Sequence, residues 1–386
     1  MNVLFTGMDW FPERQDGGLS RYFYEEVQAF AAAGFEGTAC VSCCQPQKVA
    51  AINVRGMAER NAPVFRRWKG ASDLVQEGIR NGANLIDSHF ALYARPALHR
   101  IPRHMPLVVH FHGPWTQEIL MESTGFTGRF RAALARRIER DVYARADRVI
   151  TLSEAFKTLL HQSYGVPLER IRVIPGGVDV SRFSATPERG EARRRLGWPE
   201  DRPILLAVRR LARRMGLDRL IEAIAQVRLN CPDVLLLVGG KGKEERRLRQ
   251  KIAEIGVGDN VRLLGFIPDD DLAIAYAAAD VSIVPTIALE GFGLISVESL
   301  AAGTPVLGTP IAATPEILTP LSPKLVFDSA SAADMASRIE EVVSGRVQLP
   351  DGASCREYAR RFQWSEVIPR IQSVFEEAIA EKRSLH

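Results

Sequence analysis

Two glutamates, Glu290 and Glu298, stand on either side of a glycine-containing turn, and seven residues separate them. The apolar run 281–285 before them is typical of a buried strand, and a helix is predicted to begin near Gly293. The free N–H groups at the start of a helix suit a diphosphate, and Gly291 lets the backbone approach such a ligand closely. One carboxylate can then face a sugar and the other a ribose hydroxyl, although an ordinary helix start with two surface glutamates has the same spacing.

The elements that must position these residues alternate between short apolar strands and amphipathic helices, a pattern typical of parallel-sheet α/β domains. The first half contains a predicted helix over about 19–33. Its predicted strands lie at 3–5, 38–42, 85–87, 107–111, 148–152 and 171–174. Turn-rich sequence follows over 175–203.

The same pattern then restarts, with helices predicted over 216–227 and 244–255. The predicted strands of this second half lie at 203–208, 234–238, 261–264, 281–285 and 305–307. Two successive sheets of this kind imply two doubly wound domains, with ligands bound at the carboxyl ends of the strands. The tail over 364–382 has the pattern of an amphipathic helix.

The composition agrees with a globular protein of two domains. The chain has 386 residues, of which 46% are hydrophobic and 25% charged, and this balance argues against disorder. Its formal charge of +4 and sequence pI near 8.8 do not indicate a nucleic-acid binder. A mildly basic chain suits phosphorylated ligands or contact with an acidic membrane surface.

The cysteines and the N-terminal sequence indicate in which cellular compartment the protein is expected. An odd count of five cysteines favours reduced thiols and a cytosolic setting. Cys40 and Cys43 have no second Cys/His pair nearby, so buried free thiols explain them better than a metal or redox site. We see no basic leader at the N-terminus and no run approaching the roughly 20 apolar residues of a spanning helix, so we expect neither a signal peptide nor a membrane span.

The wording of the Glu290–Glu298 segment, E-G-F-G-L-x-x-x-E, resembles the E-x7-E motif of retaining GT-B glycosyltransferases of family 4 (glycosyl transferases group 1). The resemblance implies that Glu290 contacts hydroxyls of a donor sugar and Glu298 those of the ribose. It places the backbone amides of Gly293 and Leu294 on the diphosphate, with Gly291 and Phe292 in the same donor loop.

The resemblance extends over nearly the whole chain. Gly17 and Gly18, before the first helix, resemble the family's first glycine loop, which approaches the donor phosphate; a plain helix-entry turn is the alternative. His112 resembles the histidine at a strand end of the first domain, where a neutral imidazole could bond the donor sugar or the acceptor. Phe266 and Ile267 lie in the segment whose backbone reads the nucleobase, although packing alone would also explain Phe266.

The chain departs from the family at one phosphate-binding position. Val208-Arg209-Arg210-Leu211 resembles the family's V-G-R-L, which places Arg210 on the diphosphate through its planar guanidinium. The family's lysine five residues further on is Met215 here, and its loss would weaken binding by roughly 1.5–3 kcal/mol. Arg213 or Arg214 could replace it.

Two other motifs give weaker evidence for a binding site. Asp269-Asp270-Asp271 has the look of a D-x-D metal site, but it follows Pro268 and opens a helix, so helix capping explains it better and no metal ligand is predicted. The segment 239–243 lacks the ending of a phosphate-binding P-loop. The family has a similar glycine turn beside the donor, which makes Lys241 a candidate contact.

The predicted fold is therefore α/β of the GT-B type, with two facing Rossmann-like domains and the active site in the cleft between them. The first domain covers 1–180 plus a returning helix at 365–386, and binds the acceptor. The donor domain covers 184–364. Glu290, His112 and Arg210 are the predicted catalytic residues, and we expect no cofactor or metal beyond the nucleotide-sugar co-substrate.

The predicted function is the transfer of a sugar, with retention, from a nucleotide diphosphate, with uracil as the expected base, to an acceptor hydroxyl. A GT-B nucleotide-sugar epimerase and a non-catalytic nucleotide-sugar-binding protein are the alternatives, the latter suggested by Met215. A phosphorylase of this fold would need a pyridoxal lysine, for which we see no signature.

The acceptor is open among lipid-linked saccharides, polysaccharides, small metabolites and natural products. The arginine-rich segment 129–148, with apolar residues at four-residue spacing, is either a solvated crossover helix or a surface that meets anionic lipid. We expect a cytoplasmic protein, free or peripheral at the inner membrane face, that binds no nucleic acid.

Overall fold

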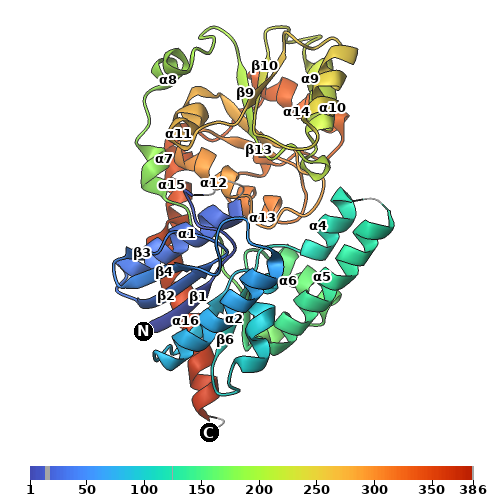
Figure 1. The fold of residues 1–386 in the computed structure, drawn as a ribbon. Helices are drawn as coiled ribbons and strands as arrows, with labels where there is room; N and C mark the ends of the chain where they lie inside the picture. The colour runs from blue at the N-terminus through green and yellow to red at the C-terminus, as the bar shows by residue number, and fades with distance from the viewer. Residues whose placement is uncertain (14–17, 124, 385–386) are drawn as a thin grey trace. The chain divides into compact units, whose positions relative to one another are not determined.

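The computed structural model describes residues 1–13, 18–123 and 125–384, and the chain divides into two compact units (Figure 1). Unit 1 consists of Met1–Val178 and Trp364–His386, and unit 2 of Asp179–Gln363. The chain thus leaves unit 1 once and returns to it with its last helix.

In the described part of unit 1, an eight-stranded sheet has the strand order β3-β4-β2-β1-β5-β6-β7-β8. All its pairs are parallel except β3 with β4. The strands are β1 (Asn2–Thr6), β2 (Glu36–Val41), β3 (Gln47–Val49), β4 (Ile52–Gly56), β5 (Leu85–Ser88), β6 (Leu107–Phe111), β7 (Arg148–Thr151) and β8 (Ile171–Val173). Because β1 lies between β2 and β5, the strand order reverses there, and the carboxyl ends of β1, β5 and β6 come together.

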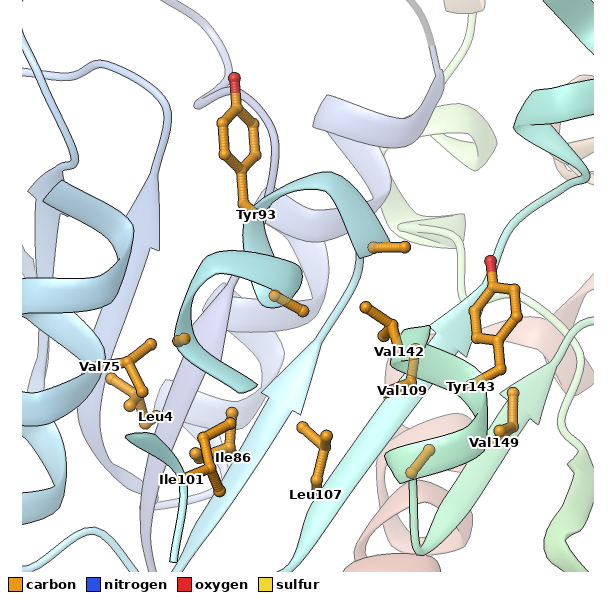
Figure 2. Close-up of a cluster of buried hydrophobic side chains, with 14 of the residues drawn as sticks. Leu4, Val75, Ile86, Tyr93, Ile101, Leu107, Val109, Val142, Tyr143 and Val149 are labelled. Carbon is orange, nitrogen blue, oxygen red and sulfur yellow. The ribbon is translucent and has the colours of Figure 1, made fainter. Parts of the chain in front are cut away.

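Helices connect these strands. They are α1 (Gly18–Ala32), α2 (Val64–Arg80), α3 (Ala91–Ala94), α4 (Trp115–Glu122), α5 (Phe126–Arg145), α6 (Glu154–Tyr164) and α16 (Trp364–Ser384), with short 3-10 turns η1 (Arg95–Arg100) and η2 (Leu168–Arg170). One core cluster packs α2, α3 and α5 on the sheet, and Figure 2 shows Val75 of α2 and Val142 of α5 directed toward Ile86 and Val109 of the strands. These side chains are almost fully buried.

The helix α16 completes unit 1 although it comes last in the chain. The ring of Phe375 stacks on Phe30 of α1, with centroids 5.4 Å apart. The indole Nε1 of Trp364 donates to Glu25 Oε2 at 3.2 Å. A Cβ on Gly177 would lie 2.4 Å from the Trp364 ring, so a larger residue at 177 would displace this contact.

Unit 2 has a parallel sheet of strand order β11-β10-β9-β12-β13 among the described residues. The strands are β9 (Ile204–Val208), β10 (Leu235–Gly239), β11 (Val261–Gly265), β12 (Val281–Val284) and β13 (Val306–Gly308). The strand order reverses at β9, which lies between β10 and β12. Ligand sites of such sheets form at the carboxyl edge beside this reversal.

The helices of unit 2 flank this sheet, and their apolar faces form its core. They are α7 (Val180–Ser184), α8 (Arg189–Leu196), α9 (Leu217–Val227), α10 (Glu245–Glu254), α11 (Asp269–Ala278), α12 (Leu294–Ala301), α13 (Thr314–Leu318), α14 (Ala332–Val343) and α15 (Gly352–Ala359), with the 3-10 turns η3 (Arg213–Met215), η4 (Pro323–Leu325) and η5 (Arg360–Phe362). Leu220 and Ile224 of α9 and Ile339 of α14 are fully buried in that core.

The structure corrects the prediction that 175–203 is only turn-rich, because α7 and α8 form there. The sequence of α8 is rich in arginine and lacks an apolar period, so the usual helix signal is weak. Tertiary contacts stabilise this helix instead. Arg193 is buried and its guanidinium donates to Ala278 O at 2.9 Å and to Asp280 Oδ2 at 2.6 Å.

Candidate functional site

The loop between β12 and α12 in unit 2 carries the two glutamates. Gly293 precedes the helix with a φ of 79°, a left-handed conformation that glycine adopts without strain. Glu290 lies in the loop and Glu298 one turn inside α12, and both are buried. The helix begins at Leu294, one residue after the predicted position.

The carboxylate of Glu290 is held at one oxygen. Its Oε2 accepts from Arg209 Nη2 at 2.5 Å and from Thr286 Oγ1 at 2.7 Å. Burial raises the pKa of Glu290, but the Arg209 guanidinium and the hydroxyl of Thr286 outweigh it and bring this pKa below its usual value. Glu290 Oε1 faces Gly293, since a Cβ there would lie 3.6 Å from it. The group is therefore an ionised carboxylate with one oxygen directed toward the start of α12.

Arg209, which sequence reasoning passed over, is the arginine that pairs with Glu290. It follows β9 directly and is buried, and its Nη2 also contacts Met215 Sδ at 2.9 Å. Arg210, the predicted phosphate ligand, is exposed. Successive side chains of an extended segment point to opposite sides, so only one of two adjacent arginines can reach Glu290. This alternation of side-chain directions was the feature of the sequence that could have drawn attention to Arg209 as well as Arg210.

Arg214 supports the same loop. Its Nη1 donates to Leu289 O at 3.0 Å, and its own carbonyl accepts from Ile287 N at 2.9 Å. Leu289 has a φ of 58°, which costs a residue with a side chain about 1–2 kcal/mol. The contact with Arg214 helps to hold this conformation, so Arg214 positions the loop that carries Glu290.

Glu298 is oriented by a tyrosine that sequence reasoning missed. The hydroxyl of Tyr276, a buried residue of α11, donates to Glu298 Oε2 at 3.1 Å. Thr304 Oγ1 in turn donates to the carbonyl of Tyr276 at 2.7 Å. Tyr276 lies within an apolar helical stretch of sequence, where it is indistinguishable from a core residue.

Four further predicted donor residues follow strands of this same sheet. Lys241, after β10, places its Nζ 5.5 Å from the ring centroid of Phe266, after β11. Ile267 is half-buried, and its side chain fills the space beside Gly239. Phe292 is buried against Phe362, with ring centroids 5.7 Å apart, so only its backbone is available to a ligand.

In unit 1, the predicted residue His112 follows β6 and is half-buried. It lies beside a histidine and carboxylate cluster at the carboxyl ends of β5 and β6, and its Nε2 is 3.1 Å from His89 Nδ1. Gly18 is the exposed first residue of α1, and Gly17 lies outside the described residues. Sequence reasoning missed His89, although it follows a buried strand just as His112 does.

These features define an α/β protein of two doubly wound units, whose second unit joins buried carboxylates, an arginine and a helix start at the carboxyl edge of its sheet. Two family descriptions match consecutive segments of the sequence. Glycosyltransferase Family 4 covers residues 16–182, and Glycosyl transferases group 1 covers residues 188–362. The two matches account for most of the chain, which belongs to the family 4 (group 1) glycosyltransferases.

Similar proteins agree with this assignment. A D-inositol 3-phosphate glycosyltransferase of Acidothermus cellulolyticus is 35% identical over 64% of this chain, and the match covers 56% of that relative. Sucrose-phosphate synthase of Thermosynechococcus elongatus shares the fold with a TM-score of 0.79 at 22% identity, over 98% of this chain and 99% of that one. HepE of Anabaena, in complex with UDP-glucose, has a TM-score of 0.74 at 20% identity over 100% of both chains. These likenesses show the GT-B fold.

Proposed function

We propose that the protein transfers a sugar from a nucleotide diphosphate, with UDP as the donor nucleotide, to an acceptor hydroxyl with retention at the anomeric carbon. The observation that carries this proposal is the buried Glu290–Arg209 pair beside the start of α12. Family membership supports the reaction, and the UDP-glucose complex of a protein of the same fold supports the donor. A non-catalytic binding protein and an epimerase are the alternatives.

In this scheme the donor diphosphate lies at the N-terminus of α12, where free amides and the helix dipole stabilise the departing charge. Arg209 adds a fixed positive charge next to Glu290. Glu290 Oε1 accepts hydrogen bonds from the donor sugar, while Oε2 is already engaged by Arg209 and Thr286. The leaving phosphate acts as the base in a front-side attack, so positioning and electrostatics supply the catalysis, and the scheme uses no metal.

The test is turnover of labelled UDP-, GDP- and ADP-sugars with a panel of acceptors that includes an inositol phosphate. We expect a product formed from the UDP-sugar with its anomeric configuration retained, as read by NMR. In Glu290→Gln, the loss of the negative charge is expected to lower kcat by about 100-fold or more, with UDP affinity little changed. Donor conversion without an acceptor would favour an epimerase, and binding without turnover a sensor.

Binding at Glu298 gives a separate prediction. UDP should raise the melting temperature of the wild-type chain, because a ligand of the folded state at 100 times its Kd adds about 2.7 kcal/mol of stability. The shift should vanish in Glu298→Ala and shrink in Tyr276→Phe, which removes only the hydroxyl that orients Glu298. An equal shift in wild type and Glu298→Ala would contradict the ribose role.

The surface of α4 and α5 suits an anionic membrane. We define the apolar–basic face by five exposed apolar residues: Leu120, Met121, Phe126, Phe130 and Leu134. Phe126 is 86% and Phe130 66% exposed, values unusual for such side chains on a surface that faces only water. The helix α5 also carries exposed arginines, which are Arg129, Arg131, Arg136, Arg137 and Arg140. We infer that this face docks on anionic lipid, since insertion of the rings and attraction of the arginines act together.

Among the described helices, none is long and apolar enough to cross a membrane. Co-sedimentation with vesicles tests the docking. Wild type should bind vesicles of phosphatidylglycerol and phosphatidylcholine, and bind poorly to phosphatidylcholine alone. The double change Phe126→Ser and Phe130→Ser should lower binding at least about 10-fold, whereas Leu229→Ser, an equally exposed site at 78% in unit 2, should not. Equal binding by both variants would overturn the docking proposal.

A further inference from the structure

Unit 1 contains a group of ionisable side chains that the proposed donor chemistry does not use. This histidine cluster consists of Glu26 of α1, Asp87 and His89 at the end of β5, His110 of β6, and His112 just after it. All but His112 are at most 2% exposed. His112 is half-buried, so the cluster reaches the surface of the unit through this ring.

Two carboxylates act on one nitrogen of His89. Its Nε2 lies 3.0 Å from Asp87 Oδ2 and 3.3 Å from Glu26 Oε1. Two buried carboxylates are costly unless positive charge compensates them. Burial lowers the pKa of His89, but Glu26 and Asp87 outweigh it and raise this pKa to about 10. At neutral pH His89 is therefore an imidazolium with a proton on each ring nitrogen.

A divalent metal would be another way to compensate the carboxylates, but the two rings are badly placed to share one. His89 and His110 stack with centroids 4.0 Å apart and an interplanar angle of 16°. The nitrogen lone pairs of an imidazole lie in its ring plane, so those of two nearly parallel rings do not converge on one ion. Asp87 instead meets each ring with a different oxygen, since Oδ1 lies 3.1 Å from His110 Nε2. Asp87 thus contacts the two rings separately, with a hydrogen bond to His89 and an ion-pair contact alone to His110.

The other nitrogen of His89 faces His112, with 3.1 Å between Nδ1 and Nε2. An imidazolium can only donate, so His112 Nε2 must be the acceptor. Burial, and then the positive charge of His89, lower the pKa of His112 well below its ordinary value. A neutral ring that accepts at Nε2 carries its single proton on Nδ1. The Tyr22 ring, 5.0 Å from that of His112, packs edge-on against it.

We propose that His89 is a positioning residue, which fixes His112 as the neutral tautomer with its proton on Nδ1 and so makes that ring a hydrogen-bond donor. The bond it would donate goes to an oxygen of the donor sugar or of the acceptor. That use rests on the proposed function, whereas the tautomer does not. The members of the cluster then act in sequence, because the carboxylates keep His89 charged and the charged His89 orients His112.

The test is two-bond proton–nitrogen NMR of the full chain labelled with 15N-histidine. The chain has seven histidines, and His112→Gln assigns the signal of His112. At pH 7 we expect a protonated Nδ1 and an unprotonated Nε2 for His112, and two protonated nitrogens for His89. A His112 protonated on Nε2, or on both nitrogens, overturns the proposal. The readout needs no turnover, so it separates this inference from the proposed reaction.

Substitutions in the cluster test whether the charge of His89 sets the tautomer of His112. The double change Glu26→Gln and Asp87→Asn leaves His89 neutral, and His112 should then move toward the Nε2-protonated form that free imidazole side chains favour. His110→Phe keeps a stacked ring but removes no bond to His112, so the tautomer should be unchanged. If the double variant does not fold, Glu26→Gln alone should shift the signal in the same direction. An unchanged tautomer in the folded carboxylate variants refutes the role of His89.

Kinetics add a further readout. Asp87→Asn is expected to lower kcat by about 10- to 100-fold, the usual effect of removing a partner that orients a functional histidine. UDP affinity should stay the same, since the proposed function places Glu290, Glu298 and Arg209 on the donor, and all three belong to unit 2. A parallel loss of UDP binding would indicate a general structural defect and contradict a positioning role.

Discussion

Arg209→Met is expected to lower kcat by about 100- to 1000-fold and to destabilise unit 2 by about 3–5 kcal/mol. The guanidinium of Arg209 is the buried partner of Glu290, at 2.5 Å from its Oε2. Removing it leaves a buried carboxylate with only the Thr286 hydroxyl from this group of contacts. Steady-state kinetics and urea unfolding at pH 7 measure the two effects.

A second substitution separates the two roles of Arg209. In Arg209→Met with Glu290→Gln, the uncompensated charge is gone, so most of the lost stability should return while activity stays low. If stability does not return, the loss in the single variant came from packing rather than from the unpaired carboxylate.

The pair also predicts a pH dependence. The pKa of Glu290 is lower in the folded chain than its ordinary value, which is about 4.3. A carboxyl group of this kind stabilises the fold above its unfolded pKa, and the contribution disappears as pH falls through the folded pKa. The difference in unfolding free energy between wild type and Arg209→Met should therefore be largest near neutral pH and shrink in acid. A difference that is constant with pH would contradict the ion pair as its source.

A methionine at position 215 is compatible with Arg209, whose guanidinium contacts its sulfur. In the resemblance of Val208–Leu211 to V-G-R-L, Arg209 occupies the glycine position, and Met215 the position of the family's lysine. Met215 Sδ lies 2.9 Å from Arg209 Nη2, so a lysine there would place two positive charges in contact. The two departures from the family pattern are therefore in direct contact, and the positive charge beside Glu290 comes from Arg209.

Gly216→Ala is the second change with a large expected effect, a loss of about 3 kcal/mol or more in the unfolding free energy. Gly216 has a φ of 69°, and a Cβ there would lie 1.9 Å from Pro285 O and 2.9 Å from Ile287 Cγ2. These atoms begin the loop that carries Glu290. Relief of the clash must move that loop, so donor binding should weaken together with stability. Urea unfolding and UDP titration measure both.

Gly197→Ala is the matched control for this change. Gly197 has almost the same φ, 66°, in the same unit, but its Cβ would meet no atom within 4 Å. The control should therefore lose only the cost of the left-handed conformation, about 1–2 kcal/mol, and keep its UDP affinity. Equal losses in the two variants would show that the contact with Pro285 is unimportant.

Much of the fold could be predicted because apolar runs mark the buried strands. β6 is where the sequence placed it, and the other predicted strands are within two residues of their observed ends. The short pair β3 and β4 was missed, since it contains only a few apolar residues, such as Ile52 and Val54. Helix α8 was missed because buried arginine contacts, rather than an apolar face, stabilise it.

The site could be predicted only where a motif gives the position of a residue along the chain. Glu290 and Glu298 were found through their spacing and the glycines between them. Tyr276, Arg209 and His89 act through contacts with residues that are distant in sequence, and pattern alone does not indicate such contacts. Adjacent arginines differ only in which side of the chain they occupy, and this choice depends on where the strand ends.

The return of α16 to unit 1 has a consequence for the order in which the protein matures on the ribosome. Unit 2 is one continuous segment, Asp179–Gln363, and is complete before Trp364 is added. Phe30 of α1 must wait for Phe375, which is synthesised more than three hundred residues later. Unit 1 therefore cannot complete its core when its N-terminal segment is made, because its apolar surface at α1 stays uncovered until α16 has been added.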